Sequence, residues 1–248
     1  MATPSLLLLL ADGRFPAGAH AHSGGLEAAV AAGRVTDLTS LEAFLAGRLA
    51  TAGLVGAAFA AAAHRVAMPE TVGSAHPARS ARPSDAPVGS PARSGALARL
   101  DAELDARTAA PALRAVSRRQ GRALLRAGRS IWSDAPFADL PATPGGAHQP
   151  LVLGLLCAAA GLSRVETATI AAYGTLTGAA SAGVRLLGLD PYQVQALLVG
   201  LADACDGTAA DAARAADDPP ERLPAAAAPL ADIHAEIHAT WEVRLFAS

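Results

Sequence analysis

The sequence predicts an all-α protein, and three observations carry that prediction. Of the 248 residues 52% are hydrophobic but only 4% are aromatic, and alanine supplies much of the apolar content. Alanine favours helices because it loses almost no side-chain entropy in them. Apolar residues recur with helical spacing, and no segment shows the clean two-residue alternation of a half-buried strand. We therefore expect one domain over residues 1–248, a helical bundle of about eight to ten helices.

The first half of the chain contains the helix that we expect to be central. A short buried helix is predicted over Leu6–Leu10, and a second begins near Ser23 after the Gly- and Pro-rich stretch 11–21. Thr39 and Glu42 have the spacing of a capping box, which predicts a helix start. One face of the long helix that follows carries Leu41, Phe44, Leu45, Leu49, Ala52, Val55 and Phe59.

The second half contains further helices with clear starts. Ser163 and Glu166 form another predicted capping box, and Asp190 before Pro191 predicts an N-cap followed by a helix to about Asp203. Small residues on the first of these helices are expected to let a neighbouring helix approach closely; they are Gly174, Gly178, Ala182 and Gly183. A last amphipathic piece is predicted over Ile233–Phe246.

Two segments are predicted to be poorly ordered. Residues 67–95 carry repeated Pro, Gly, Ser and Arg with scarcely a large apolar side chain, so we expect a flexible loop with helices resuming at Ala96. Prolines between Pro219 and Pro229 exclude a continuous helix there. The C-terminal segment 217–248 is therefore expected to be loosely tethered in the free protein.

The composition limits the possible functions. The net charge of −2 gives no general reason to expect nucleic acid or an anionic membrane as a partner. All 20 basic residues are arginine, so neither a P-loop lysine nor a Schiff base is available. Two cysteines, Cys157 and Cys205, form no disulfide framework, and the Leu6–Leu10 run lacks the basic residue of a signal peptide. We expect a cytoplasmic protein without a membrane span.

A turn rich in histidine is the first candidate site. His20 and His22 lie two residues apart, a spacing that can share a metal ion in an extended loop, although no further ligand is nearby. The alternative interpretation is a structured turn in which Ser23 caps the next helix and the histidines lie on the surface. A serine nucleophile elbow is excluded because Ala21 stands where glycine is needed. His234 and His238, one helical turn apart, form a second possible weak metal pair or an exposed face.

A ridge of arginines is the second candidate. They recur every fourth residue at Arg114, Arg118, Arg122 and Arg126. Guanidinium groups at this spacing suit carboxylates or phosphates of a partner. The acidic residues Asp101, Glu103 and Asp105 just upstream provide the alternative, an internally compensated face.

Several segments form an ordered pattern along the chain. The first runs through Phe15, Pro16, Gly18, Ser23, Gly25, Leu26 and Glu27, and a mid-chain segment covers Ser117–Leu125 after Asp101, Leu104 and Ala106. Later members are Tyr173, Val184–Leu189 and the tail residues His238, Arg244, Leu245, Phe246 and Ser248. Taken together, these segments resemble the UreF family of urease accessory proteins.

The resemblance implies a urease maturation adaptor that is not an enzyme. Such an adaptor forms a homodimer, binds a UreD/UreH-type subunit, recruits the GTPase UreG and assists nickel insertion into apo-urease; nickel is handled by the complex, and the chain needs no cofactor. The residues expected to contact partners are Phe15, Pro16, Gly18, His20, His22, Ser23, Glu27, Arg118, Arg122, Arg185, Trp241, Arg244, Leu245 and Phe246. Trp241 and Phe246 are expected to be the anchors in a UreD-type partner, with Arg244 as the polar contact.

Two other functions stay open at this point. A metallochaperone would bind nickel itself through His20 and His22, which a spectroscopic nickel titration of the purified chain separates from the adaptor. A helical hydrolase would need a catalytic constellation, and none can be assembled from the sequence.

Overall fold

The computed structural model describes residues 4–16, 21–68 and 89–246, and these residues contain no strand. The α-helices are α1 (Pro4–Ala11), α2 (Leu26–Ala31), α3 (Leu38–Arg48), α4 (Leu54–Ala67), α5 (Pro91–Arg107), α6 (Pro111–Ile131), α7 (Gln149–Ala159), α8 (Arg164–Leu187), α9 (Pro191–Gly200), α10 (Ala202–Ala215) and α11 (Pro229–Ala239). Short turns of other helix types are η2 (Leu49–Gly53), η3 (Phe137–Asp139) and η4 (Pro220–Arg222).

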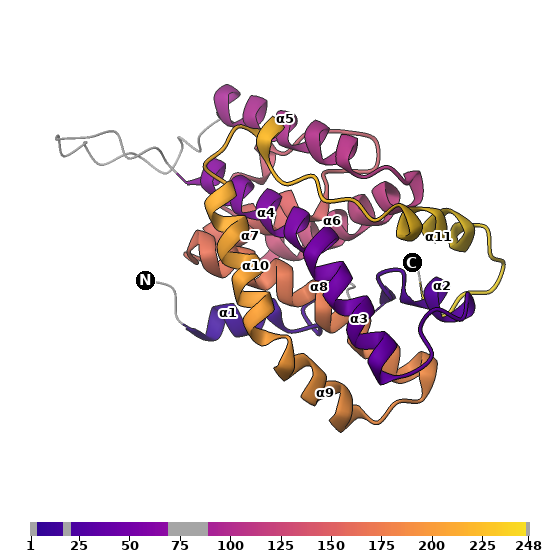
Figure 1. The fold of residues 1–248 in the computed structure, drawn as a ribbon. Helices are drawn as coiled ribbons and strands as arrows, with labels where there is room; N and C mark the ends of the chain where they lie inside the picture. Colours follow the sequence, from indigo (N-terminus) through magenta and orange to yellow (C-terminus); the bar gives the residue numbers. More distant parts are fainter. Residues whose placement is uncertain (1–3, 17–20, 69–88, 247–248) are drawn as a thin grey trace, which may run out of the picture.

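A single long helix runs through the middle of the molecule. The π-helical turn η2 joins α3 to α4, so Leu38–Ala67 is one helix of 30 residues. Counted in this way, the described residues contain ten α-helices, which confirms the predicted all-α fold. Figure 1 shows α4 in the centre, with α5 above it and α9 at the opposite side of the bundle.

The core forms around α4, which packs against α5, α7, α8 and α10. Its residues 57–63 are at most 1% exposed, and all of them except Phe59 are alanine. Small side chains let the backbones approach: a Cβ on Gly154 of α7 would lie 2.3 Å from the carbonyl oxygen of Ala60. The buried cluster extends from Leu10 in α1 to Phe246 in the tail, so one core serves the whole described chain.

The helix Leu38–Ala67 is also long and apolar enough to cross a membrane by length and composition. Helices that form the core of a folded bundle pass the same test. Here Ala57, Phe59 and Ala61 are wholly buried by neighbouring helices, which accounts for the apolar composition.

Most predicted helix starts are confirmed, and one is wrong. Ser163 and Glu166 form the predicted capping box, and Asp190 caps α9 before Pro191. The long helix begins two residues before the predicted cap, because Asp37 accepts the N–H of Ser40 at 2.8 Å. The serine hydroxyl also accepts the N–H of Asp37, which completes the capping box.

Three helix boundaries differ from the prediction. Helix α5 starts at Pro91, capped by Ser90, so only part of the expected loop 67–95 is non-helical in the described residues, and 69–88 lie outside them. Helix α10 was not predicted; its buried face is Cys205 and small alanines, which give no large apolar stripe. Helix α11 ends at Ala239, so the predicted piece 233–246 is helical only in its first half.

The small residues predicted on α8 divide into two groups. A Cβ on Gly183 would lie 2.9 Å from a methyl group of Leu41, so this position confirms close helix contact. Ala182 is buried as well. A Cβ on Gly174 or Gly178 would meet nothing within 4 Å, so close packing was the wrong prediction at these two positions.

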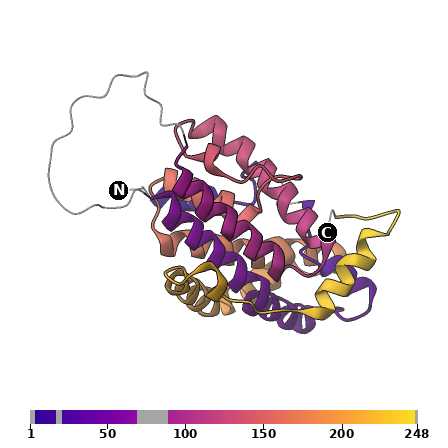
Figure 2. The same ribbon diagram turned by 90° about the horizontal axis from the view of Figure 1, so that it is seen from above.

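The prediction of a loosely tethered segment 217–248 is wrong for its described part, residues 217–246. Arg107 donates hydrogen bonds to the carbonyl oxygens of Pro220, Glu221 and Leu223 at 3.2, 3.0 and 3.3 Å, and Leu223 is buried. Helix α11 lies beside α2 in both views (Figures 1 and 2). The prolines of this segment exclude a continuous helix, but side chains of other elements hold its backbone in place.

Candidate functional site

Glu27 ties the N-terminal part of the chain to its C-terminal part. Its carboxylate accepts the backbone N–H groups of Leu245 at 2.8 Å and Phe246 at 3.0 Å, and it lies 2.9 Å from Nε2 of His238. These four residues, here called the tail clamp, join α2 to α11 and the segment after it. Glu27 and His238 are both buried, so the pair holds the tail on the body of the protein.

The tail clamp stabilises the ionised form of Glu27. Burial alone would raise the pKa of its carboxyl, but the hydrogen bonds from the Leu245 amide, His238 and the Phe246 amide outweigh burial and lower the pKa. Glu27 is therefore a buried carboxylate whose oxygens are satisfied by hydrogen-bond donors of its own chain. This arrangement suits a role in holding the structure together.

The predicted partner anchors are partly buried against their own chain. Phe246 is 4% exposed, and the guanidinium of Arg185 lies 4.4 Å from the centre of its ring, within cation–π range. The rings of Trp241 and His238 have centres 4.7 Å apart and are tilted by 59° to each other. Leu245 is 74% exposed and Arg244 is exposed too. Phe246 is therefore covered by its own chain, whereas Arg244 and Leu245 are accessible, and a role of Phe246 as partner anchor stays a prediction.

The predicted N-terminal surface is largely internal. Phe15 and Ser23 are buried. The N-cap residue of α2 is Gly25 and not the predicted Ser23, although the Ser23 hydroxyl accepts the N–H of Glu27 at 3.3 Å. Pro16 is exposed, while Gly18 and His20 lie outside the described residues. Ser23 and Glu27 are thus unsuited to direct partner contact in this conformation.

The described residues form no cluster of three or more His, Cys, Asp or Glu side chains suited to a metal ion. His22 is half-buried beside two cavities. His238 is 3% exposed and bound to Glu27, so it shares no exposed metal-binding face with His234. Metal binding by His20 and His22 stays a prediction.

Arg118 lies at the centre of a polar network between α5, α6 and the loop before α7. It donates to Asp101 at 3.0 Å, to Asp105 at 2.8 Å and to the carbonyl oxygen of Gly146 at 2.6 Å. Its side chain is 13% exposed and that of Asp101 only 4%. The internally compensated interpretation therefore holds for Arg118 in this structure, and its contact with a partner stays a prediction.

His148 extends this network. With Ser117 and Asp105 it forms a Ser–His–Asp arrangement of the kind that serine hydrolases use. Its Nδ1 lies 3.0 Å from the Ser117 hydroxyl, and its Nε2 lies 3.0 Å from Asp105. A catalytic histidine must accept the serine proton. Burial and the charge of Arg118 lower the pKa of His148 and oppose that step. The Ser117 hydroxyl also accepts the N–H of Gln149, so the group fixes the start of α7.

Four other arginines of α6 form an accessible basic face, whereas Arg114 is half-buried and pairs with Asp105. Arg122 is exposed and donates to the carbonyl oxygen of Gly145. Arg119, Arg126 and Arg129 are exposed as well, and this face stays available to an acidic partner. The sequence spacing did not distinguish these side chains from the inward Arg118.

Exposed apolar side chains occur on two parts of the fold. The first, called the α11 face, comprises Ile233, Ile237, Val243 and Leu245, which are 56%, 51%, 85% and 74% exposed. The second, called the α1–α9 face, comprises Leu8, Tyr192 and Val199, which are 68%, 86% and 76% exposed. Helices α1 and α9 flank one cavity of about 1140 Å³. The two faces are candidates for contact with other proteins, because contiguous apolar patches at a surface mark such contacts.

Sequence reasoning missed His148 and Arg48, whose surroundings come from several elements, and it did not identify Asp101 as buried. Asp101 lies on the buried side of α5 between Leu97 and Leu104. An acidic residue inside an apolar stripe is a signal that could have been read, because such a residue needs a buried partner.

Comparison with known proteins agrees with this architecture. The UreF family model matches residues 35–202. Proteins named urease accessory protein UreF from Mycolicibacterium vanbaalenii, Mycobacterium sp. strain JLS and Mycobacterium marinum are 40%, 42% and 42% identical over 248 residues, which is 100% of both chains in each case. The chain therefore belongs to the UreF family.

Proposed function

We propose that this protein is a non-catalytic adaptor of urease maturation, which bridges a UreD/UreH-type subunit and the GTPase UreG and assists nickel insertion into apo-urease in the cytoplasm. The observation that carries the proposal is identity of 40–42% along the entire chain with proteins named urease accessory protein UreF. The name describes an auxiliary protein of another enzyme, so urease itself supplies the catalytic site.

The side chains present in the sequence support the proposal that a partner protein, and not this chain, hydrolyses GTP. The chain has no lysine, so it lacks the P-loop residue that binds the β- and γ-phosphates of GTP. The single Ser–His–Asp arrangement in the described residues, Ser117 with His148 and Asp105, has a histidine whose pKa is lowered. Nucleotide hydrolysis must therefore come from a partner.

The two apolar faces support two different contacts. We assign the α11 face to the UreD/UreH-type subunit, because its side chains protrude from a helix that the tail clamp already fixes. We assign the α1–α9 face to a second copy of the chain, which would give the expected homodimer. An amphipathic helix with protruding apolar side chains is a common docking element.

The assignment of the α11 face is tested by capture of the UreD/UreH-type subunit in co-expression. The double variant Ile233→Ser/Ile237→Ser removes two half-exposed apolar side chains, so we expect its recovery of the subunit to fall by at least about tenfold. The thermal midpoint should change little because neither side chain is buried. Subunit recovery is measured by quantitative gel analysis after affinity purification.

The matched control is Tyr192→Ser/Val199→Ser on the α1–α9 face. This variant should still capture the UreD/UreH-type subunit but should dissociate the homodimer in sedimentation velocity. Undiminished capture by Ile233→Ser/Ile237→Ser would refute the assignment of the α11 face. Loss of capture by both variants at an unchanged thermal midpoint would show that dimerisation itself is required.

A further inference from the structure

Arg48 has a guanidinium group without a partner in the described residues. Its Nε atom is buried and makes no hydrogen bond, while the side chain as a whole is half-buried. Arg93 and Arg107 also have a buried Nε without a hydrogen bond, but they form ion pairs with Asp139 and Glu103. Arg48 is therefore the one of these three half-buried arginines that has no carboxylate partner within the described residues, and removing a cation from water without an anion beside it is costly.

The guanidinium of Arg48 is held in place by its neighbours. A Cβ on Gly24, whose φ is +63°, would lie 3.0 Å from Cζ of Arg48, so the glycine makes room for the group. The ring of Phe44 lies 6.0 Å from Cζ on another side. Burial lowers the pKa of Arg48 to about 10, so the side chain remains charged at neutral pH.

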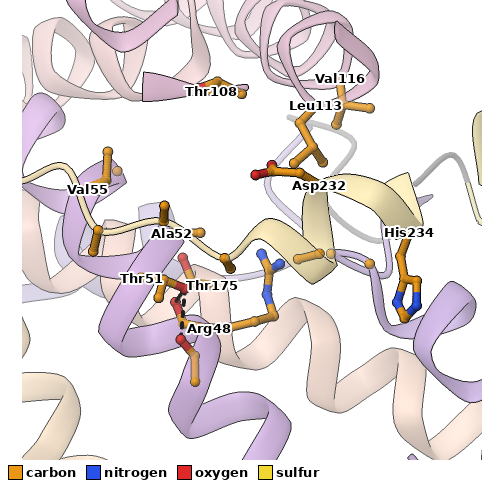
Figure 3. Close-up of a pocket in the computed structure, with 18 of the residues that line it drawn as sticks. Arg48, Thr51, Ala52, Val55, Thr108, Leu113, Val116, Thr175, Asp232 and His234 are labelled. Atoms are coloured by element: carbon orange, nitrogen blue, oxygen red, sulfur yellow. Dashed lines mark hydrogen bonds between the residues drawn. The ribbon is translucent and has the colours of Figure 1, made fainter. Parts of the chain in front are cut away.

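Arg48 borders a cavity of about 680 Å³ between the central helix, α6 and α11. Figure 3 shows its side chain and Asp232 entering this space from different helices, with Leu113 and Val116 on the opposite wall. Ala52 and Val55 add apolar surface from the central helix. Pockets for small molecules typically have about 300–1,000 Å³ and a mainly apolar lining with few polar groups.

The guanidinium of Arg48 favours a singly charged, planar anion. The hydroxyls of Thr51 and Thr175 donate to carbonyl oxygens within their own helices at 2.8 and 3.1 Å, so they are not free donors for a ligand. One guanidinium can neutralise one carboxylate in two parallel hydrogen bonds. The carboxylate of Asp232 in the same cavity repels any anion, and it repels a phosphate dianion more strongly than a monocarboxylate.

We propose that this cavity binds a small monocarboxylic acid, with its carboxylate on Arg48 and its apolar body along Ala52, Val55, Leu113 and Val116. The site goes beyond the adaptor function, since it requires no partner protein. A bound carboxylate would give Arg48 the anionic partner that it lacks within the described residues, beside the apolar side chains of the cavity.

The proposal is tested by calorimetric titration of the purified full chain with sodium hexanoate at constant ionic strength. We expect saturable binding with a dissociation constant of about 1 mM or tighter. Arg48→Met should weaken binding by at least about tenfold, because it removes a charged hydrogen-bond pair. Its matched control is Arg34→Met, which alters an exposed arginine lining the same cavity and should change the affinity less than about twofold.

Two further measurements distinguish binding of a carboxylate from binding of other ligands. Ala52→Leu fills the cavity while keeping Arg48 and should also abolish binding, and hexan-1-ol should bind at least about tenfold more weakly than hexanoate. The thermal midpoint of each variant verifies that it is folded. Absent hexanoate binding, unchanged affinity in Arg48→Met, or equal affinity for inorganic phosphate would overturn the proposal.

Discussion

Arg118 and Arg122 lie one helical turn apart on α6 and have different surroundings. Arg118 bridges Asp101 and Asp105, and its charge together with the His148 hydrogen bond lowers the pKa of Asp105 although burial acts to raise it. Arg122 is exposed and meets a single backbone carbonyl, that of Gly145. The two positions form a natural pair for measuring how much burial adds to an arginine contact.

We expect Arg118→Met to lower the free energy of unfolding by about 3–5 kcal/mol, because the buried carboxylate of Asp101 would lose its cation. Arg122→Met is the control and should cost at most about 1 kcal/mol. Urea denaturation at neutral pH measures both changes. Similar losses in the two variants would contradict a structural role specific to Arg118.

The residue pattern predicted the arginine row but not which members face inward. Spacing by four residues places side chains on one gently turning ridge. The inward position of Arg118 depends on Asp101 and Asp105 of α5, and on Gly146 in the loop before α7. The sequence named the acidic residues as a possible compensating face, but it could not show which arginine they bind.

At the scale of the helices, glycine sets how closely α7 approaches α4. A Cβ on Gly154 would lie 2.3 Å from the Ala60 carbonyl oxygen and 2.7 Å from the His64 nitrogen. Both are backbone atoms of a central helix and cannot rotate away. Gly174 in α8 has nothing within 4 Å of the same position and lies on the surface.

We expect Gly154→Ala to lower the free energy of unfolding by about 3 kcal/mol, the upper end for overpacking, because the two helices must separate. Gly174→Ala should instead raise it by up to about 1 kcal/mol, since alanine is the better helix former. Thermal and urea unfolding measure the changes. A neutral Gly154→Ala would mean that α7 can shift without loss of packing.

Helix prediction succeeded where local chemistry marks a boundary and failed where alanine provides the packing. The Ser163–Glu166 capping box and the Asp190–Pro191 start both mark helices in the structure. Helix α10 escaped prediction because its buried residues are Cys205 and alanines, whose spacing hardly differs from the alanine-rich chain around it. Its position is fixed by contact with α8 and with α4, and α4 lies far away in sequence.

Across the whole molecule, the tail clamp joins parts of the chain separated by more than 200 residues. The Glu27–Phe246 hydrogen bond spans 219 positions. Local sequence could not predict it, because the prolines between Pro219 and Pro229 indicate only the absence of a helix. The buried donors around Glu27 show that the tail forms part of the free protein's core, and an anchoring role for Phe246 in a partner would require its release.

The tail clamp gives the final prediction, which concerns Glu27→Gln. Hydrogen bonds to a charged group contribute more than neutral ones, so the variant should lose about 1.5–3 kcal/mol of unfolding free energy at pH 7. Hydrogen exchange at the amides of Leu245 and Phe246 should accelerate, because both donate to the altered carboxylate. The control is Glu242→Gln, an exposed tail residue that should leave the exchange rates unchanged.

The dependence on pH provides an independent check of the same clamp. The folded-state pKa of Glu27 lies below its ordinary value of 4.5. Its contribution to stability is therefore fully present above pH 4.5 and disappears as the pH falls through the folded-state pKa. In Glu27→Gln this part of the acid-induced loss should be missing, so the stability difference from the natural protein should shrink on acidification. A difference that stays constant down to pH 3, or grows there, would show that the ionised carboxylate does not hold the tail.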